Sequence, residues 1–391
     1  MRKVTFLVNS FSFGGAERVL SVIVSELVKQ KYEVEVISLE RNEFYQLPKE
    51  VKKTYLSDFT GKESGLKKLL YLPIFAWKLK KCIKSNNIRL VQSHLYRANY
   101  VNLLAKLFGA NHKTQIVNAG VISRYKKEGL VGKINLFLIK KLYPKADLII
   151  WKSKGMQIDA NRLFNFYAKQ IVINNPYDIK KIQNLAKEEI KDFKFDKSKI
   201  YLISVGRLIS LKRNEDLIQA LKFLDERVEV LFLGDGEKKE YLKKLVKDLN
   251  LGKRVHFLGN VSNPFKYLAK SNIFIHTSET EGFPNVLIEA MACGLPVISS
   301  DCLSGPREIL APDTDITKQL KKGDGLEEAK YGILFPVGDI EALVDAIKML
   351  LNNKEKLEYY KNQSLKRCKD FSVEKIVNQY KKVLLNEEDS N

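Results

Sequence analysis

The sequence has few cysteines and no long apolar run, and these two shortages exclude several classes of protein. Its four cysteines show neither the spacing of a metal site nor that of a disulfide framework, which fits a reducing cytoplasm: Cys82, Cys293, Cys302 and Cys368. The apolar run at residues 69–77 is too short for a membrane-spanning helix, which needs about 20 residues. Residues 4–8 follow a basic start but stop at Asn9, so we expect a buried strand there rather than a signal peptide.

Acidic residues are scarce in the first half of the chain. Residues 1–175 contain 31 Lys and Arg against 12 Asp and Glu, whereas residues 176–391 contain 36 against 34. Nearly all of the net charge of +21 therefore belongs to the first half. Lysine is abundant in both halves, so a general enrichment in lysine does not explain why acids are scarce in only one. A basic region of this kind favours an anionic partner: a membrane surface, a nucleic acid or a phosphorylated substrate.

Short apolar runs alternate with amphipathic stretches along the whole chain of 391 residues, which is long enough for two domains. This alternation predicts an α/β fold with two doubly wound, Rossmann-like parallel sheets. The first set of strands is expected at residues 4–8, 34–39, 90–92, 115–117, 147–151 and 171–173. The second set is expected at residues 200–205, 228–233, 254–258, 272–276, 296–299 and 332–335.

Helices are expected between these strands, at residues 15–30, 65–85, 95–109, 132–143, 214–223, 237–249, 264–270, 284–293, 339–351 and 355–368. Asparagines and Pro176 interrupt the pattern, which predicts a first domain at 1–175 and a second at 176–372. A last helix at about 373–386 is expected to pack back on the first domain. Residues 311–330 are predicted to be a polar loop, in which Asp313 and Asp315 fit a turn better than a metal site.

The stretch from Glu281 to Glu289 carries the most chemical information. A strand precedes it, and Gly282 and Pro284 open a helix with an apolar face. The start of a helix attracts anions, so a phosphate can bind there with Glu281 beside the group that it carries. Glu289 lies about 7–8 Å further along the helix, at 1.5 Å per residue, where a diol such as ribose can donate to it. This layout is typical of a site for a nucleotide sugar.

Three other loops follow predicted strands and can contact the same ligand. Gly206 allows close approach of the backbone, and Arg207 and Lys212 can bind phosphate. Gly15 lies in a double glycine that follows the first strand, and Asn260 follows a strand whose end can pair with a base. Each loop alone also fits an ordinary solvated turn. Together they gain weight because ligands of open parallel sheets bind beyond the carboxyl ends of the strands.

These motifs resemble, in order and over essentially the whole chain, the retaining glycosyltransferases of family 4. The resemblance rests on Gly14-Gly15-Ala16-Glu17-Arg18, Val205-Gly206-Arg207 with Lys212, Leu233-Gly234-Asp235-Gly236-Glu237, Phe257-Leu258-Gly259, and Glu281 to Glu289 followed by Ala292-Cys293-Gly294-Leu295-Pro296-Val297. It implies the GT-B architecture, in which two Rossmann-like domains face a central cleft. The chain is most similar to bacterial enzymes that extend lipid-linked glycans, capsule or lipopolysaccharide.

The resemblance also implies roles for residues. Arg207 and Lys212 are expected to neutralise the pyrophosphate of the donor, and Glu281 to hold its sugar rather than to act as the nucleophile. The remaining donor-binding residues are Gly15, Gly206, Asn260, Gly282, Phe283, Pro284, Asn285 and Glu289, the last on the ribose hydroxyls. Because the two cations and the helix start supply the positive charge, no metal and no other cofactor are expected.

One position departs from the family. Many members have a histidine near the reacting carbon, after the fourth or fifth strand of the first domain. The matching stretch here contains Asn118, which can form hydrogen bonds but cannot act as a base. His94 is the nearest histidine in the sequence, and it is either a residue of the active site or a structural one.

Two basic amphipathic segments, residues 67–81 and 124–141, are candidates for contact with a membrane. Each also fits a core-packing helix with a solvated lysine face. In this family the first domain holds the acceptor, so its basic charge suits a lipid-linked pyrophosphate acceptor. We expect a cytoplasmic protein that is peripheral on the inner face of the cell membrane.

The resulting hypothesis is a retaining hexosyltransferase. It moves a hexose or N-acetylhexosamine from a UDP-sugar to a lipid-linked acceptor of the polyprenyl-pyrophosphate or lipopolysaccharide type, although uracil and guanine both stay open as the base. A GT-B enzyme for a soluble acceptor and a GT-B epimerase are alternatives. A basic nucleic-acid-binding protein is an alternative of another class, but the sequence contains no module that reads a groove, so no nucleic acid is expected as a partner.

Overall fold

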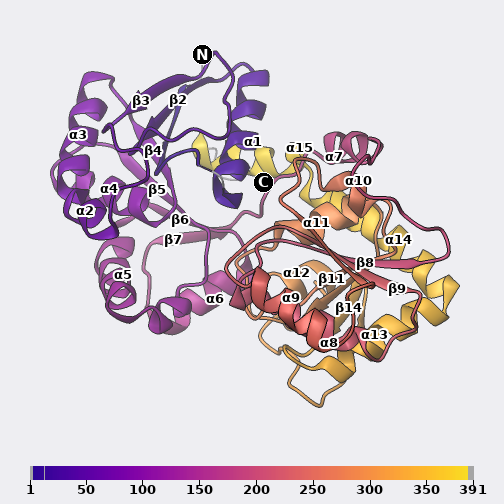
Figure 1. The fold of residues 1–391 in the computed structure, drawn as a ribbon. Helices are drawn as coiled ribbons and strands as arrows, with labels where there is room; N and C mark the ends of the chain where they lie inside the picture. Colours follow the sequence, from indigo (N-terminus) through magenta and orange to yellow (C-terminus); the bar gives the residue numbers. More distant parts are fainter. Residues whose placement is uncertain (1–2, 13, 386–391) are drawn as a thin grey trace. The chain divides into compact units, whose positions relative to one another are not determined.

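The structure is a computed structural model, and it describes residues 3–12 and 14–385. The chain divides into two compact units. The first unit extends to Pro176 and also includes the residues from Val373 onwards, whereas the second extends from Tyr177 to Ser372. Each unit contains one sheet with helices around it (Figure 1). The last helix of the chain therefore belongs to the first unit.

The first sheet is parallel throughout, and its strands in the described chain have the spatial order β3-β2-β1-β4-β5-β6-β7. They are β1 (Lys3–Val8), β2 (Glu33–Ser38), β3 (Lys52–Tyr55), β4 (Leu90–His94), β5 (Lys113–Asn118), β6 (Leu148–Trp151) and β7 (Lys169–Val172). The chain winds outward in opposite directions from the central pair, β1 and β4, in which Val8 lies opposite His94. This pair is the topological switch point, at which open α/β sheets bind their ligands.

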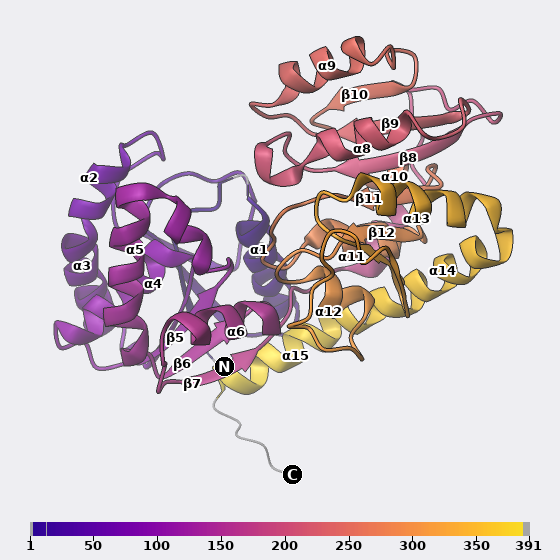
Figure 2. The same cartoon turned by 90° about the horizontal axis from the view of Figure 1, so that it is seen from below.

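Helices cover both faces of the first sheet. They are α1 (Gly15–Lys29), α2 (Gly65–Leu70), α3 (Leu72–Ser85), α4 (Tyr96–Leu107), α5 (Gly129–Leu142), α6 (Lys154–Leu163) and α15 (Val373–Leu384), with single turns η1 (Ser123–Lys127) and η2 (Tyr143–Lys145). On one face, Leu20 and Ile23 of α1 share a core with Val377 and Tyr380 of α15. The helices α3, α4 and α5 gather on the other side (Figure 2).

The second sheet repeats this plan with the order β10-β9-β8-β11-β12-β14-β13 in the described residues. Its strands are β8 (Ile200–Val205), β9 (Val228–Leu233), β10 (Val255–Gly259), β11 (Ile273–His276), β12 (Val297–Ser300), β13 (Glu327–Ala329) and β14 (Gly332–Phe335). All pairs are parallel except β13 with β14. The winding direction reverses between β8 and β11, so these two strands form the switch point of this sheet.

The helices of the second unit are α7 (Ile179–Leu185), α8 (Asn214–Leu221), α9 (Lys239–Asp248), α10 (Phe265–Leu268), α11 (Asn285–Ala292), α12 (Pro306–Leu310), α13 (Ile340–Asn352) and α14 (Lys354–Arg367), with turns η3 (Ser210–Lys212) and η4 (Cys368–Phe371). Leu217 of α8, Leu242 of α9 and Leu343 of α13 bury their apolar faces in one core against the sheet. α11 packs against α14 and the η4 turn. Both units are thus doubly wound, as the alternation of runs predicts.

Several elements differ from the prediction. The helix expected over residues 65–85 is two helices that meet at Tyr71, because Pro73 favours the first turn of a new helix and lacks the N–H that would continue the hydrogen bonds of the first one. The edge strands β3 and β13 were not predicted, since their sequences, Lys-Lys-Thr-Tyr and Glu-Glu-Ala, lack the apolar signal of a buried strand. The helices α6, α7 and α12 were also not predicted.

The polar segment at residues 311–330 is fastened to the second sheet by a buried arginine. The Nε of Arg307 lies 3.0 Å from Oδ2 of Asp301, a buried residue that directly follows β12. The same guanidinium donates to Glu327 on β13 at 2.8 Å. Asp313 pairs with a lysine at 2.8 Å, and Asp315 accepts a backbone N–H two residues further on at 2.9 Å. These two aspartates therefore serve turns and surface pairs in this structure.

Candidate active site

The switch point of the second sheet brings together residues that lie far apart in the sequence. Arg207 and Lys212 follow β8, and Glu281 follows the neighbouring strand β11. The Nζ of Lys212 forms an ion pair with Oε1 of Glu281. Both side chains are partly exposed, 23% for Lys212 and 15% for Glu281, so a ligand can reach them. Arg207 is exposed, and no ion pair links its side chain to another described residue.

A histidine completes this pair. The Nε2 of His276, the last residue of β11, lies 3.1 Å from the Oε1 of Glu281 that also binds Lys212. Burial opposes ionisation of the carboxyl group, yet Lys212 and His276 together hold the pKa of Glu281 well below its usual range. Burial lowers the pKa of His276 itself. The site therefore presents an ionised carboxylate between a cationic lysine and a neutral imidazole.

Backbone contacts hold the two loops against each other. The hydroxyl of Thr277 donates to the carbonyl of Lys212 at 2.7 Å, and the N–H of Glu279 donates to the carbonyl of Leu211 at 2.8 Å. The N–H of Glu281 donates to the carbonyl of Leu303 at 3.2 Å, beyond β12. Three neighbouring strand ends thus determine where Lys212 and Glu281 lie.

The loops that follow β8 and β9 approach each other closely, and this explains the glycine at position 234. Gly234 has a φ of 136°, and a Cβ at this position would lie 2.0 Å from the carbonyl oxygen of Gly206. The N–H of Gly206 donates to the carbonyl of Leu233 at 2.9 Å. A larger residue at Gly234 would therefore push the loop that carries Arg207 and Lys212 away from β9.

The turn before α11 differs in one detail from the prediction. Pro284 precedes the helix as its cap instead of lying in its first turn, and α11 begins at Asn285 without a side-chain cap from the described residues. Gly305 contacts the proline ring so closely that a Cβ there would lie 2.3 Å from Pro284 Cδ. The hydroxyl of Ser304 donates to the carbonyl of Gly282 at 2.7 Å. The loop at the helix start is therefore tightly packed.

The remaining donor-binding candidates of this unit have different surroundings. Phe283 is buried, with its ring centre 5.5 Å from that of Phe371, and the side chain of Asn285 accepts the hydroxyl of Tyr177 at 2.6 Å. Glu289 is buried on the second turn of α11. Asn260 is exposed and follows β10, which β9 separates from β8. Asn260 thus stands two strands away from the switch point.

In the first unit, the structure places Gly15 and His94 at the switch point of the first sheet. Gly15 is exposed and begins α1 after β1, and His94 ends the neighbouring strand β4. His94 is buried, with Nε2 3.1 Å from Oε1 of Gln92. Burial, and then the charge of Lys152, hold the pKa of His94 well below its usual range. This histidine is thus neutral at physiological pH.

Asn118 lies one strand further out, at the end of β5. Its Oδ1 accepts the hydroxyl of Tyr143 at 3.3 Å, and its Nδ2 donates to the carbonyl of Gly120 at 2.5 Å. The side chain is largely buried, and both of its polar ends have partners. In this conformation Asn118 stabilises the turn after β5.

Three residues near these sites have no role in the sequence prediction: His276, Ser299 and Lys152. His276 fits the pattern of a strand, although a histidine at a strand end five residues before Glu281 is a usable signal. Ser299, which contacts His276, is recognisable only from strand pairing. Lys152, directly after β6, is buried and donates to the hydroxyl of Tyr380, and burial lowers its pKa to about 7. Nothing local in the sequence marks this lysine as buried.

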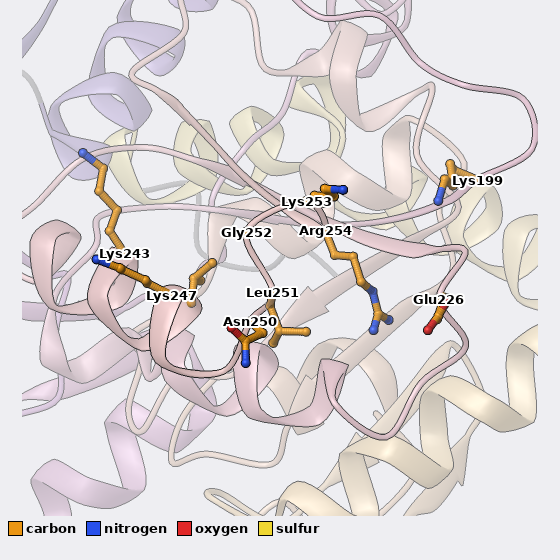
Figure 3. Close-up of a pocket in the computed structure, with 10 residues that line it drawn as sticks. Lys199, Glu226, Lys243, Lys247, Asn250, Leu251, Gly252, Lys253 and Arg254 are labelled. Atoms are coloured by element: carbon orange, nitrogen blue, oxygen red, sulfur yellow. The ribbon is translucent and has the colours of Figure 1, made fainter.

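A hollow of about 810 Å³ lies elsewhere on the second unit (Figure 3). Half of its lining residues are basic: Lys199, Lys243, Lys247, Lys253 and Arg254. Lys199 and Arg254 directly precede β8 and β10, so the hollow lies at the amino edge of the sheet, opposite to Glu281. Arg254 also donates to three backbone carbonyls before and within β9. Ligands of open parallel sheets bind at the carboxyl edge, so we assign no substrate to this hollow.

Residues 3–12 and 14–385 contain no group of three or more His, Cys, Asp or Glu side chains arranged to hold a metal ion. Arg207 and Lys212, which follow β8, supply positive charge at the switch point of the second sheet.

Comparisons with known proteins identify the family. The description "Glycosyltransferase Family 4" matches residues 13–181, and "Glycosyl transferases group 1" matches residues 186–367. The chain is 33% identical, over 98% of its length and all of the relative's, to an N-acetylgalactosamine-N,N'-diacetylbacillosaminyl-diphospho-undecaprenol 4-alpha-N-acetylgalactosaminyltransferase of Campylobacter jejuni. It is 27% identical over 390 residues, 98% of either chain, to a second N-acetyl-D-galactosaminyltransferase of that organism, which is named for a diNAcBac-PP-undecaprenol glycan.

Solved structures agree on the fold. The Anabaena protein HepE, solved in complex with UDP, superposes with a TM-score of 0.73 over 99% of this chain and all of that one, at 20% sequence identity. The two parallel sheets and the two matches in sequence thus lead to one conclusion. The chain is a glycosyltransferase of family 4 with the GT-B fold.

Proposed function

We propose that this enzyme transfers a hexose or N-acetylhexosamine from a UDP-sugar to a lipid-linked acceptor, with retention at the anomeric carbon. The observation that carries the proposal is the group of Lys212, His276 and Glu281 at the switch point of the second sheet. Both Campylobacter relatives are named as N-acetylgalactosaminyltransferases of undecaprenol-linked glycans, which favours an N-acetylhexosamine. The UDP complexes of HepE favour uracil as the base.

The donor pyrophosphate is proposed to bind beside Lys212 and Arg207, with the start of α11 as a third source of positive charge. Negative charge grows on the leaving nucleotide as the sugar bond breaks, and fixed cations stabilise it. Arg207 is exposed and can form two parallel hydrogen bonds with a phosphate. These cations are the basis for proposing a reaction without a metal ion, and full activity after treatment with a chelator would support this.

Glu281 is proposed to hold the sugar of the donor rather than to attack it. Its Oε1 already accepts from both Lys212 and His276, and this contact lowers the nucleophilicity of the carboxylate. The low pKa of Glu281 keeps the group ionised, so that it can accept hydrogen bonds from sugar hydroxyls. Retention then follows from attack on the face of the leaving group or from a short-lived ion pair. Glu289 is proposed to bind the ribose.

The acceptor side of the proposal rests on the surface of the first unit. Leu66 and Leu70 of α2, and Ile74 and Trp77 of α3, are exposed at intervals of three or four residues. Lys81 lies 3.5 Å from the centre of the Trp77 ring. An exposed apolar stripe with lysines beside it is typical of a surface that binds in the interface of an anionic membrane.

A second exposed stripe on α5 supports the same partner. Leu130, Val131 and Phe137 are exposed, and the lysines of residues 124–141 are exposed with them: Lys126, Lys127, Lys133, Lys140 and Lys141. Among the described helices, none combines the length and the apolar character that crossing a bilayer requires. We propose that α2, α3 and α5 attach the enzyme to the inner face of the cell membrane, where a lipid-linked acceptor is available.

Transfer of labelled sugar from UDP-N-acetylhexosamines and UDP-hexoses to an undecaprenyl-diphosphate glycan tests the reaction. Glu281→Ala and Arg207→Ala are expected to lower transfer by about 10²-fold or more, as loss of a charge-stabilising group does. Glu240→Ala removes an exposed acid of the same unit and serves as the control. Transfer near the wild-type rate by both site variants would show that the site is assigned wrongly.

Sedimentation with phosphatidylglycerol vesicles at physiological salt tests the membrane partner. The wild type is expected to sediment with them more than with phosphatidylcholine vesicles, and the double variant Ile74→Ser/Trp77→Ser is expected to remain largely in solution. Phe223→Ser removes an equally exposed aromatic side chain from the second unit and is expected to behave as the wild type. Equal recovery of all proteins with both lipids would show that this surface does not bind anionic membranes.

A further inference from the structure

Both ring nitrogens of His276 have a polar partner in the structure. His276 is buried at the end of β11, directly opposite Ser299 of β12. Its Nδ1 lies 2.9 Å from Oγ of Ser299, and its Nε2 lies 3.1 Å from Oε1 of Glu281. A neutral imidazole carries one N–H and one acceptor nitrogen, so the two contacts decide between them which nitrogen has the proton.

The hydroxyl of Ser299 has one proton and two acceptors within reach. It can donate to Nδ1 of His276 or to the carbonyl of Ser300 at 3.0 Å. If it donates to Ser300, then Nδ1 must carry the proton and the lone pair of Nε2 faces an ionised carboxylate, which is repulsive. If it donates to Nδ1, then Nε2 carries the proton and donates it to Glu281. With His276 neutral and Glu281 ionised, only the second arrangement gives a hydrogen-bond partner to the Ser299 hydroxyl, to both ring nitrogens and to the carboxylate.

We propose that His276 is a positioning residue of the transfer reaction, with its tautomer set by Ser299. In this role it donates Nε2–H to Oε1 of Glu281, the oxygen that also binds Lys212. In the described part of the chain, every hydrogen bond of this carboxylate is made by Oε1, which leaves Oε2 for the sugar of the donor. The inference rests on the proposed function, and it adds the two residues that determine the orientation of Glu281.

The first test compares two replacements of the histidine. His276→Gln keeps one N–H donor near the position of Nε2, whereas His276→Leu has a similar volume and no donor. Loss of a hydrogen bond to a charged group is expected to lower kcat/KM for the UDP-sugar by about 10- to 100-fold in His276→Leu. His276→Gln should stay within about five-fold of the wild type, since it restores that bond.

Binding of UDP without its sugar separates positioning from simple damage to the fold. UDP does not reach Oε2 of Glu281 in this arrangement, so its Kd by calorimetry should change by less than about three-fold in either variant. A residue with only a structural role would weaken UDP binding and lower Tm together with kcat/KM.

Ser299→Ala provides an independent measurement. It removes the group that sets the tautomer, and a loss of about three- to ten-fold in kcat/KM is expected. Because Ser299 acts through His276, the double variant Ser299→Ala/His276→Gln should equal His276→Gln alone. Nitrogen-15 spectra of labelled histidine are practical, since the chain has four histidines, and the signal lost in His276→Gln identifies the residue. That signal should report a proton on Nε2 at neutral pH.

Three results would overturn the inference: wild-type kcat/KM in His276→Leu, equal losses in His276→Gln and His276→Leu, or a proton on Nδ1 in the spectrum. Glu281→Ala in the same assay distinguishes this failure from failure of the proposed function. If Glu281→Ala is as active as the wild type, the site itself is assigned wrongly. If Glu281→Ala is inactive while His276→Leu is active, the proposed function stands and only the role of His276 is lost.

Discussion

The two units share the order of their first five strands and differ in the chemistry at the carboxyl edges of their sheets. At the switch point of the second sheet, an ionised carboxylate lies between Lys212 and His276. At that of the first sheet, His94 is buried, neutral and bonded to a glutamine. The first unit carries its charge elsewhere, on exposed lysines of α3 and α5. The same fold thus supports a charged site in one unit and a basic surface in the other, because strand ends and helix faces vary independently.

The largest expected effect comes from breaking the charged pair of the second unit. Lys212→Met removes the cation beside Glu281 and is expected to lower kcat/KM by about 10²- to 10³-fold, as loss of a preorganised donor to developing charge does. Lys243→Met, an exposed lysine of the same unit, is the control and should change little. A loss below ten-fold in Lys212→Met would mean that Lys212 does not supply the charge that stabilises the leaving nucleotide.

The next effect concerns the basic surface of the first unit. Lys140→Gln/Lys141→Gln should lower partition onto phosphatidylglycerol vesicles by about 25-fold, at about 1 kcal/mol for each lysine near an anionic surface. Lys247→Gln/Lys253→Gln makes the same change in charge at the hollow of the second unit. If both double variants lose binding equally, the attraction depends on net charge and not on the surface of the first unit.

Replacement of His94 tests whether its switch point takes part in the chemistry. Because burial holds the pKa of His94 well below its usual range, its imidazole is a weak base, and His94→Asn is expected to lower kcat/KM by no more than about ten-fold. A drop of about 10³-fold, together with loss of one limb of the pH profile, would instead identify His94 as a general base. The first unit would then have a catalytic edge comparable to that of the second.

The smallest expected effect is on stability. The pKa of Glu281 is lowered in the folded protein, so its ionisation stabilises the fold above the ordinary glutamate pKa, and this contribution disappears as the pH falls through the lowered value. Glu281→Gln should therefore lose about 1–2 kcal/mol, or about 3–8 °C in Tm, near neutral pH. The difference from the wild type should shrink between about pH 5 and pH 3. A constant difference over that range would mean that the carboxylate is not held by its charge.

Much of the fold could be predicted from the sequence, because buried parallel strands and amphipathic helices have strong periodic signals. The elements that were missed lack that signal. The edge strand β3 is polar. The apolar pattern over residues 65–85 predicts one long helix, but Pro73 starts a new helix within it. Within the candidate site, motifs in the sequence point to Glu281, Arg207 and Lys212, whereas His276 fits only a strand pattern.

By itself, the sequence determined two α/β units, the spacing of Glu281 and Glu289, and the basic character of the first half. Only the tertiary structure decided that Lys212 pairs with Glu281, 69 positions away, and that Ser299 contacts His276. The physical reason is that local periodicity determines which segments become strands, whereas the order of strands in the sheet determines which loop ends meet. Since β8, β11 and β12 are neighbours, their loops build one site from residues that no local pattern connects.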